Sequence, residues 1–286
     1  MKNTVKKALC GVLAAATLGS VGMMTACETK NPEVQMKVEF NGTTYTLEYK
    51  LYRKITPQTV NHFLTLVAHG YYNGVCIHDY DASGEKMYTG GYTYENNELL
   101  EKDYFNTVKE TYESFPYSVW TDSKKENPLY TLAGEFADND FYVGAVDPTT
   151  GKRGNENALK QSFGALTMYY TPKKTDQEIV VSKISDATKT IEKKYKYNSA
   201  TSLFSISFST TEKVDEAYCT FATLKSDFID DLQALLDAIK DTGADTTEKE
   251  VAVDKDDQYE QDYDNTAVYS VPNKAIVITS MSVIKY

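Results

Sequence analysis

The chain has 286 residues and a net charge of −11, from 30 basic and 41 acidic side chains. Hydrophobic residues make up 41% and charged residues 25% of the composition, a globular balance that excludes wholesale disorder. The length suffices for one domain with a sizeable core. Because so acidic a surface repels a phosphate backbone, we expect no nucleic-acid partner. With only three histidines, histidine-rich metal sites are scarce.

The first 27 residues have the layout of a secretory signal. Lys2, Lys6 and Lys7 precede an apolar run over 8–24, and Cys27 follows a small-residue cleavage position. This layout resembles a bacterial lipoprotein signal. The resemblance implies that residues 1–26 are removed, that the Cys27 thiol receives a lipid, and that 27–34 form a tether. The protein would then be extracytoplasmic and anchored to the bacterial cell membrane by that lipid. A plain secreted protein with an incidental cysteine is the alternative, and the run is short for a spanning helix.

Two cysteines, Cys76 and Cys219, remain beyond the signal, both in apolar, β-rich stretches. An oxidising compartment permits a disulfide between them. Two buried free thiols are the interpretation that we favour.

Two helices are expected. The first has Thr56 as its N-cap and Pro57 at its first position, and Gly70 ends it. The second has Ser226 as its cap and ends at Gly243. Each carries apolar residues at helical spacing. They are Val60, Phe63, Leu64, Val67 and Ala68 in the first helix, and Phe228, Leu232, Leu235, Leu236 and Ile239 in the second.

The rest of the chain is rich in strands. Residues 35–40 and 44–52 flank Asn41-Gly42, which predicts a hairpin, and further strands are expected at 75–80, 164–170, 203–208, 218–224 and 275–286. Many strands without a βαβ rhythm indicate a mainly β protein, an antiparallel barrel or sandwich. Three stretches are expected to be insertions in one domain over 35–286, namely 95–128, 171–197 and 241–265.

The insertion at 241–265 holds ten acidic residues against Lys249 and Lys255. We interpret it as a solvated, partly disordered loop. A calcium site is an alternative with little support, because the spacing lacks the glycine-containing loop of an EF-hand.

Seven segments, in order, resemble the cyclophilin family of peptidyl-prolyl isomerases. The first, 49–64, matches the strand before the first helix, and 70–78 matches the glycine-aromatic run that leads into the Phe-His-Arg strand. The remaining five are 90–91, 134–136, 164–168, 198–204 and 214–221. The resemblance implies an eight-stranded antiparallel barrel capped by two α-helices. Because side chains fill the interior of such a barrel, the peptide groove would lie on its outer face.

The resemblance also implies the site. A cyclophilin rotates X-Pro bonds of peptides against a barrier of about 18–20 kcal/mol, and it needs no cofactor and no metal. In exported polypeptides, proline-containing segments would be the partners. Carried over position by position, the peptide-binding residues are Met87, Thr89, Gly90, Tyr169, Leu203, Phe204, Ser205, Val214 and Tyr218. His78 matches a family histidine, for which a structural hydrogen bond is the expected role.

Asp79 stands where the family has its catalytic arginine. An ionised carboxylate only accepts hydrogen bonds, so it cannot donate to the prolyl nitrogen as the guanidinium does. Leu203 and Ser205 also replace a glutamine and a phenylalanine of the family, and Arg153 is a remote candidate for a substitute donor. No catalytic residue is therefore assigned, and we expect isomerase activity to be weak or lost.

Two non-enzymatic alternatives stay open. The first is a proline-peptide-binding module or holdase, which uses tyrosines near the groove such as Tyr92, Tyr94, Tyr169 and Tyr170. Ordinary packing of the insertions explains those tyrosines equally well. The second is a surface scaffold in which the acidic stretch 241–265 is the working part.

Overall fold

The computed structural model describes residues 31–113, 115, 119–170, 178–183, 186–194, 200–252 and 266–286. The expected signal over 1–26 and residues 27–30 of the expected tether, Cys27 included, lie outside the described residues, as do Asn198 and Ser199 of the sixth family-like segment. In the described part, no helix is long and apolar enough to cross a membrane.

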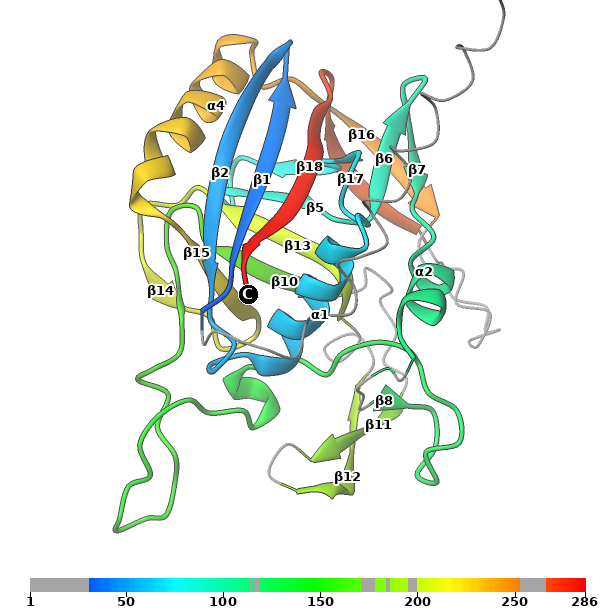
Figure 1. Ribbon diagram of the computed structural model, residues 1–286, viewed down its shortest axis with the longest axis vertical. Coiled ribbons are helices and arrows are strands. Elements are labelled where there is room, and N and C mark those ends of the chain that lie inside the picture. The colour runs from blue at the N-terminus through cyan, green and yellow to red at the C-terminus, as the bar shows by residue number, and fades with distance from the viewer. Residues whose placement is uncertain are drawn as a thin grey trace, which may run out of the picture.

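The main sheet is antiparallel, and its strands follow the order β3-β18-β1-β2-β15-β10-β13-β5-β4 (Figure 1). Their bounds are β1 Glu33–Phe40, β2 Thr43–Leu51, β3 Val75–Cys76, β4 Asp79–Asp81, β5 Lys86–Thr89, β10 Leu166–Tyr170, β13 Ala200–Ser207, β15 Cys219–Leu224 and β18 Ile276–Lys285. The strands expected from the sequence are all present, whereas β5 was not expected.

The sheet curls until its two ends meet. β3 pairs with β18, and β4 pairs with β5, yet only Ile77 and His78 separate β3 from β4 in the chain. The N–H of Ile77 donates to the carbonyl of Ile276 at 2.8 Å, and the N–H of His78 donates to the carbonyl of Tyr88 at 3.0 Å. The segment 75–81 therefore passes from one edge of the sheet to the other. Counted as one strand, it gives the eight strands that the resemblance implied.

The expected hairpin is confirmed. β1 and β2 pair in an unbroken register from Glu33↔Lys50 to Phe40↔Thr43. Asn41 and Gly42 have φ of 50° and 80°, the left-handed conformation that a two-residue hairpin turn requires. Alternate side chains of β1 face inward, and Val34, Met36, Val38 and Phe40 are almost fully buried.

Two helices pack against the barrel (Figure 1). α1 spans Pro57–Ala68 and contacts β15 and β18, and α4 spans Ile229–Asp241 and contacts β1 and β2. The expected inward residues are buried in α1, apart from the exposed Ala68. In α4, Leu232, Leu235 and Ile239 are buried and Leu236 is partly buried, as is Phe228 just before the helix.

The expected caps of both helices differ from the structure. Thr56 occupies the N-cap position of α1, but its side chain makes no capping hydrogen bond. The Glu135 carboxylate caps this end instead, accepting from the N–H groups of Gln58 and Thr59 at 3.1 and 2.9 Å. Ser226 begins a short 3₁₀ turn, η2 (Ser226–Phe228), so the N-cap of α4 is Phe228, two residues later than expected.

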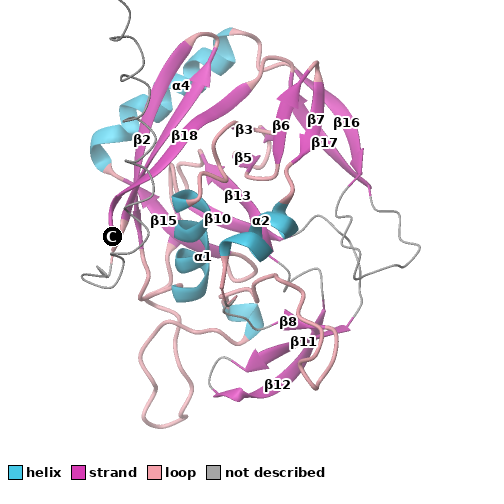
Figure 2. Ribbon diagram, turned by 45° about the vertical axis from the view of Figure 1, so that its right-hand side comes forward, coloured by secondary structure: helices cyan, strands magenta, loops and turns pink. Residues whose placement is uncertain are grey.

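The three expected insertions carry structure of their own. The first contains β7 (Glu98–Glu101), which pairs with β6 (Tyr92–Glu95), then α2 (Tyr104–Thr111) and β8 (Val119–Trp120). β11 (Glu178–Lys183) and β12 (Asp186–Lys194) of the second insertion extend from β8 as a three-stranded sheet beyond the barrel (Figure 2). The remaining elements are β9 (Lys160–Gln161), β14 (Lys213–Val214) and η1 (Ala137–Asn139).

The acidic stretch 241–265 was expected to be a solvated loop, and part of it is not. Thr246–Ala252 forms β16, which pairs over seven residues with β17 (Thr266–Pro272). Successive side chains of a strand point to opposite faces, so Val251 of β16 turns to the face opposite Glu250. Val251 packs against a small cluster that contains Tyr92, Tyr269 and Val271.

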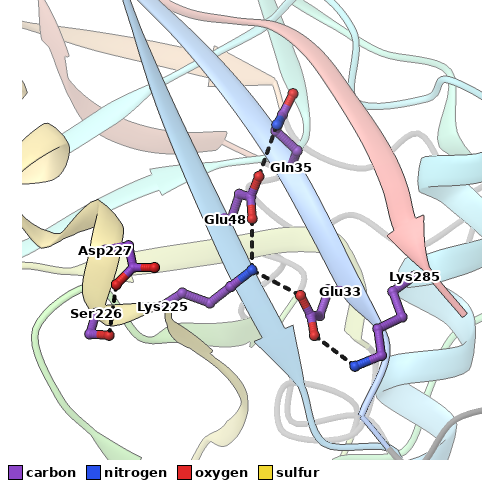
Figure 3. A network of polar contacts seen from close by, with 7 residues as sticks. All are labelled: Glu33, Gln35, Glu48, Lys225, Ser226, Asp227 and Lys285. Atoms are coloured by element: carbon purple, nitrogen blue, oxygen red, sulfur yellow. Dashed lines mark hydrogen bonds and ion pairs between the residues drawn. The ribbon is translucent and has the colours of Figure 1, made fainter.

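An ionic network ties the termini of the barrel strands together (Figure 3). The Lys225 ammonium donates to the carboxylates of Glu33 at 2.9 Å and Glu48 at 2.8 Å. Lys285 contacts the other oxygen of Glu33 at 2.9 Å, and Gln35 donates to Glu48. The hydrogen bond from Lys225 lowers the pKa of both carboxyl groups below the ordinary value of 4.5. The network therefore links β1, β2, β18 and the start of η2.

Candidate functional site on the outer face of the barrel

The pairing register separates the two faces of the barrel wall. In one cross-strand row, Asp79 lies opposite Tyr88, Tyr88 opposite Ser205, and Ser205 opposite Thr167. Side chains directly opposite each other share a face of the sheet. The neighbouring row contains Met87, Ile206 and Leu166, which all belong to the core. Asp79 and Tyr88 therefore lie on the outer face, and Met87 points inward.

Three of the expected peptide-binding residues are interior residues. Met87, Thr89 and Phe204 have no exposed surface, and Phe204 packs edge-to-face on Phe63 of α1 at 5.5 Å between ring centroids. Thr89 donates its hydroxyl to the carbonyl of Cys76 at 2.8 Å. These contacts leave the three side chains no surface for a peptide in this structure, so we do not include them in the candidate site.

Three tyrosines gather on the outer face, and we call Tyr88, Tyr169 and Tyr218 the tyrosine cluster. The Tyr169 ring meets Tyr88 edge-on at 4.9 Å and lies parallel to Tyr218 at 5.9 Å. Lys86 places its ammonium 5.7 Å from the centre of the Tyr218 ring. All four side chains are partly exposed. Tyr169 and Tyr218 were expected at the site, and Tyr88 and Lys86 were not.

Short polar side chains lie in the same row of the wall. Ser205 and Thr167 are 3% and 2% exposed although they belong to the outer face, so larger neighbours shield them. Thr167 and Thr220 share a hydrogen bond at 3.1 Å between their hydroxyl oxygens. The wall behind the tyrosine cluster is therefore small and polar rather than apolar.

Asp79 is bound to another part of the chain. Its Oδ1 accepts a hydrogen bond from the backbone N–H of Ser270 in β17 at 2.9 Å, and β17 packs beside β4. Partial burial raises the pKa of the Asp79 carboxyl, the hydrogen bond from Ser270 lowers it, and nearby Asp81 raises it further. The carboxylate acts here as an acceptor that holds the β16–β17 ribbon against the barrel.

His78 is enclosed by aromatic rings next to Asp79. Its ring lies 4.8 Å from Tyr92 and 4.7 Å from Tyr269, and it is 1% exposed. Burial lowers the pKa of His78 to about 3, so the imidazole is neutral at physiological pH. The neutral, enclosed imidazole therefore has a packing role. Its contacts with the two tyrosine rings hold it in place, rather than the structural hydrogen bond that was expected.

Within the residues that the structure describes, no group of three or more histidine, cysteine, aspartate or glutamate side chains is arranged to hold a metal. Cys76 and Cys219 are both buried and unbonded to each other. Burial raises the pKa of the Cys76 thiol to about 12 and raises that of Cys219 as well.

Comparison with known proteins decides the family. The model described as cyclophilin type peptidyl-prolyl cis-trans isomerase/CLD matches residues 35–257. The chain belongs to the cyclophilin family. No curated protein matches it.

Two solved structures of a cyclophilin type peptidyl-prolyl cis-trans isomerase from Cryptosporidium parvum are similar to this cyclophilin, each at 15% sequence identity. The match to the first structure spans 90% of this chain and 99% of the Cryptosporidium parvum chain, with a TM-score of 0.40. The second was determined in the presence of the dipeptide Ala-Pro and covers 89% and 99%, with a TM-score of 0.39.

The other expected site residues of this cyclophilin are dispersed. Gly90 has φ of 99°, and a Cβ there would lie 2.3 Å from the carbonyl oxygen of Ser202, so only glycine fits. Leu203 is 5% exposed and packs over Gly91. Val214 pairs with Lys160 in the separate β9–β14 ribbon. The only expected residues that meet at the tyrosine cluster are Tyr169 and Tyr218, with Ser205 in the adjoining wall.

Arg153 does not substitute for the missing arginine in this structure. Its guanidinium donates to the carbonyl of Gly144 at 3.0 Å, inside its own loop.

Sequence reasoning missed the two residues that define the outer face beside Asp79. Tyr88 was available from the alternation of β5, since it lies between the inward Met87 and Thr89. Ser270 had no such signal, because a backbone N–H leaves no trace in the residue type and lies 191 positions from Asp79.

Proposed function

We propose that this protein is an extracytoplasmic, lipid-anchored cyclophilin in which prolyl isomerase activity is weak or lost. The observation that carries the proposal is the hydrogen bond from the Ser270 N–H to the Asp79 carboxylate. Asp79 stands at the position of the family arginine, and its carboxylate is an acceptor that already binds a backbone N–H of the protein itself.

The chemistry of the reaction explains why this matters. The twisted X-Pro amide is stabilised by a donor to the prolyl nitrogen, as the peptide bond loses its resonance. An aspartate beside a neighbouring aspartate supplies negative charge instead of a fixed donor. In acyl-transfer sites, loss of a positioned donor lowers the rate by about 10²- to 10³-fold, a loose guide to the effect here.

A second candidate function is binding without catalysis, and the tyrosine cluster favours it. Partly exposed tyrosines supply contact area at a low cost in side-chain entropy. The cluster would bind proline-containing segments of exported polypeptides, as a holdase does. The surface-scaffold alternative relies instead on residues 241–265, of which 241–252 are described and include β16.

A protease-free isomerisation assay on a short X-Pro peptide tests the proposal. The unmodified protein is expected to give no acceleration, and Asp79→Arg is expected to give a measurable gain. Asp79→Asn is the matched control, since it removes the charge without supplying a guanidinium. Clear acceleration by the unmodified protein would contradict the loss of catalysis, and Arg153→Ala would then identify or exclude the substitute donor.

Binding is measured separately with the same peptide. Tyr169→Ala removes the ring that contacts both Tyr88 and Tyr218. If the tyrosine cluster binds peptide, this variant weakens binding while unfolding at nearly the same temperature as the parent. If binding is unchanged, the cluster is ordinary packing and the module hypothesis fails.

Membrane anchoring is tested in the cell. Expressed in a bacterium that processes lipoproteins, the protein is expected in the membrane fraction, with a lipid mass on an N-terminal Cys27. Cys27→Ser should move it to the soluble fraction. A membrane-bound Cys27→Ser variant, or an unmodified Cys27, would refute the anchor.

A further inference from the structure

A groove outside the barrel lies between two strands that belong to different ribbons. It has a volume of about 800 Å³, and its walls are residues 98–106 of β7 and α2 and residues 249–251 of β16. Figure 2 shows β6, β7, β16 and β17 gathered at one end of the molecule. The groove is separate from the tyrosine cluster, none of whose residues lines it.

The register of the β6–β7 ribbon directs one strand edge into the groove. Lys102 donates its N–H to the carbonyl of Gly91 at 2.8 Å, just beyond the paired Tyr92 and Glu101. In antiparallel pairs, hydrogen-bonded positions alternate with positions whose N–H and C=O point outward. Counting back from Lys102, Leu100 is bonded to β6 and the backbone of Leu99 points away from it. Leu99 is one of the residues that line the groove.

The same alternation shows that the edge of β16 that does not pair with β17 forms the other wall of the groove. Asn273 donates its N–H to the carbonyl of Asp245 at 2.9 Å, adjacent to the pair Thr246↔Pro272. The alternation then leaves the backbone of Glu250 pointing away from β17, and Glu250 lines the groove. The same alternation points the Ser270 N–H away from β16. This agrees with the hydrogen bond that this N–H donates to Asp79.

The charges around the groove are unbalanced. Four carboxylates come from the two walls, at Glu98, Glu101, Asp103 and Glu250, against two lysines. The two lysines of the lining are engaged by backbone carbonyls: Lys102 donates to Tyr71 and Asn73, and Lys249 donates to Asn97. Leu100, at 43% exposed, adds apolar surface. The groove therefore offers strand edges within an acidic rim.

We propose that this groove binds an extended, lysine- or arginine-containing segment of a partner polypeptide, which adds as a strand alongside β7 and β16. Strand addition supplies backbone hydrogen bonds, and side-chain surroundings supply selectivity. Charge complementarity identifies a basic segment as the occupant. A second copy of this chain is a poor occupant, because two molecules of net charge −11 repel each other.

The test uses the full-length chain in detergent and a fluorescent ten-residue peptide in which lysine and threonine alternate. Binding is followed by fluorescence anisotropy. Three further probes are used: the same peptide with glutamate in place of lysine, and two lysine peptides N-methylated at the odd or at the even positions. N-methylation removes the donors of one strand edge while leaving the charge unchanged.

The double variant Glu98→Lys/Glu250→Lys should weaken binding of the lysine peptide by at least about tenfold, because like charges then face each other. Glu212→Lys/Asp237→Lys is the matched control, with the same change in net charge at exposed positions away from the groove. It should alter binding by less than about twofold. Equal losses in the two double variants would mean attraction to the net charge alone and would overturn the proposal.

The N-methylated probes separate strand addition from side-chain attraction. Each is expected to bind more weakly than the parent peptide, since each has lost the donors of one edge. Unchanged binding of both methylated peptides, or equal binding of the glutamate peptide, would refute strand addition. The Tyr169→Ala variant should bind the lysine peptide as the parent does, so the outcome is independent of the proposed function at the tyrosine cluster.

Discussion

The carboxylate of Glu135 caps the N-terminus of α1 by accepting from Thr59 in its first turn, although 76 residues separate Glu135 from Thr59 in the chain. Its Oε2 lies 2.9 Å from the Thr59 N–H, and its Oε1 accepts from the N–H of Gln58. The cap is also buried, at 4% exposure, so the charge that suits the positive end of a helix is held in a poorly solvated place.

Burial raises the pKa of Glu135 to about 7, against the opposing effect of hydrogen bonds from Thr59 and Gln58. Since the folded state then holds its proton at a pH where the unfolded state has lost it, stability falls as pH rises from about 4.5 through 7. We expect Glu135→Gln to flatten this dependence of the unfolding free energy, which amounts to about 3 kcal/mol at most. Chemical denaturation at pH 5 and pH 8 measures it.

Glu135→Ala is the control for the cap itself. It removes both acceptors and the titrating group, so it should show the same flattened pH dependence and be about 1 kcal/mol less stable than Glu135→Gln at both pH values. An unchanged pH dependence in Glu135→Gln would show that another group is responsible.

The Lys225 network should contribute stability in the opposite pH range. The pKa values of Glu33 and Glu48 are lowered, so the contribution is present above about 4.5 and is lost as pH falls through the folded values. Lys225→Met should cost only about 1 kcal/mol of unfolding free energy at pH 7, because the Lys225 side chain is 32% exposed and its ion pairs are partly screened. It should cost almost nothing at pH 3, where the two carboxylates are protonated. Lys285→Met, which loses one contact at a more exposed site, should cost less. An equal loss at both pH values would mean that packing of the lysine stem is what matters.

Asp79 should control the docking of the β16–β17 ribbon. Asp79→Ala removes the acceptor for the Ser270 N–H, and amide exchange at Ser270 is expected to accelerate by about tenfold, equivalent to about 1.4 kcal/mol. Asp81→Ala is the neighbouring control, since Asp81 accepts from Ser83 and Gly84 within its own turn. The assignment of Asp79 fails if Ser270 exchanges at the same rate in both variants.

Cys76 and Cys219 should resist alkylation in the folded state. Both thiols are buried, and burial raises the pKa of each, so little thiolate is present at pH 8. Mass spectrometry after brief treatment with iodoacetamide should find both unmodified, and both modified after unfolding in urea. Modification of either cysteine in the folded protein would show that its part of the wall opens.

The barrel was predictable because its signals are local. Asn41-Gly42 fixes a turn, Val60, Phe63, Leu64 and Val67 fall on one helical face, and the family-like segments follow in order. The site was less predictable because facing is set by register. Met87, Thr89 and Phe204 were expected in the groove, yet the register of β5 with β13 turns all three inward and presents Tyr88 outward. Glu135 as a cap, and Ser270 as the partner of Asp79, depend on contacts between distant segments and leave no local pattern.

The meeting of the sheet's two ends at residues 75–81 sets a condition on how the molecule is made. β18 lies between β3 and β1 in the sheet. Residues 276–285 must therefore be synthesised before either of these strands can pair with it. More than two hundred residues of synthesis separate β1 from that partner. Until then, the long edge of β1 and the short edge of β3 are open to other chains, and such late, non-local pairing is slow. During biosynthesis, the nascent chain is itself a client that needs protection from aggregation.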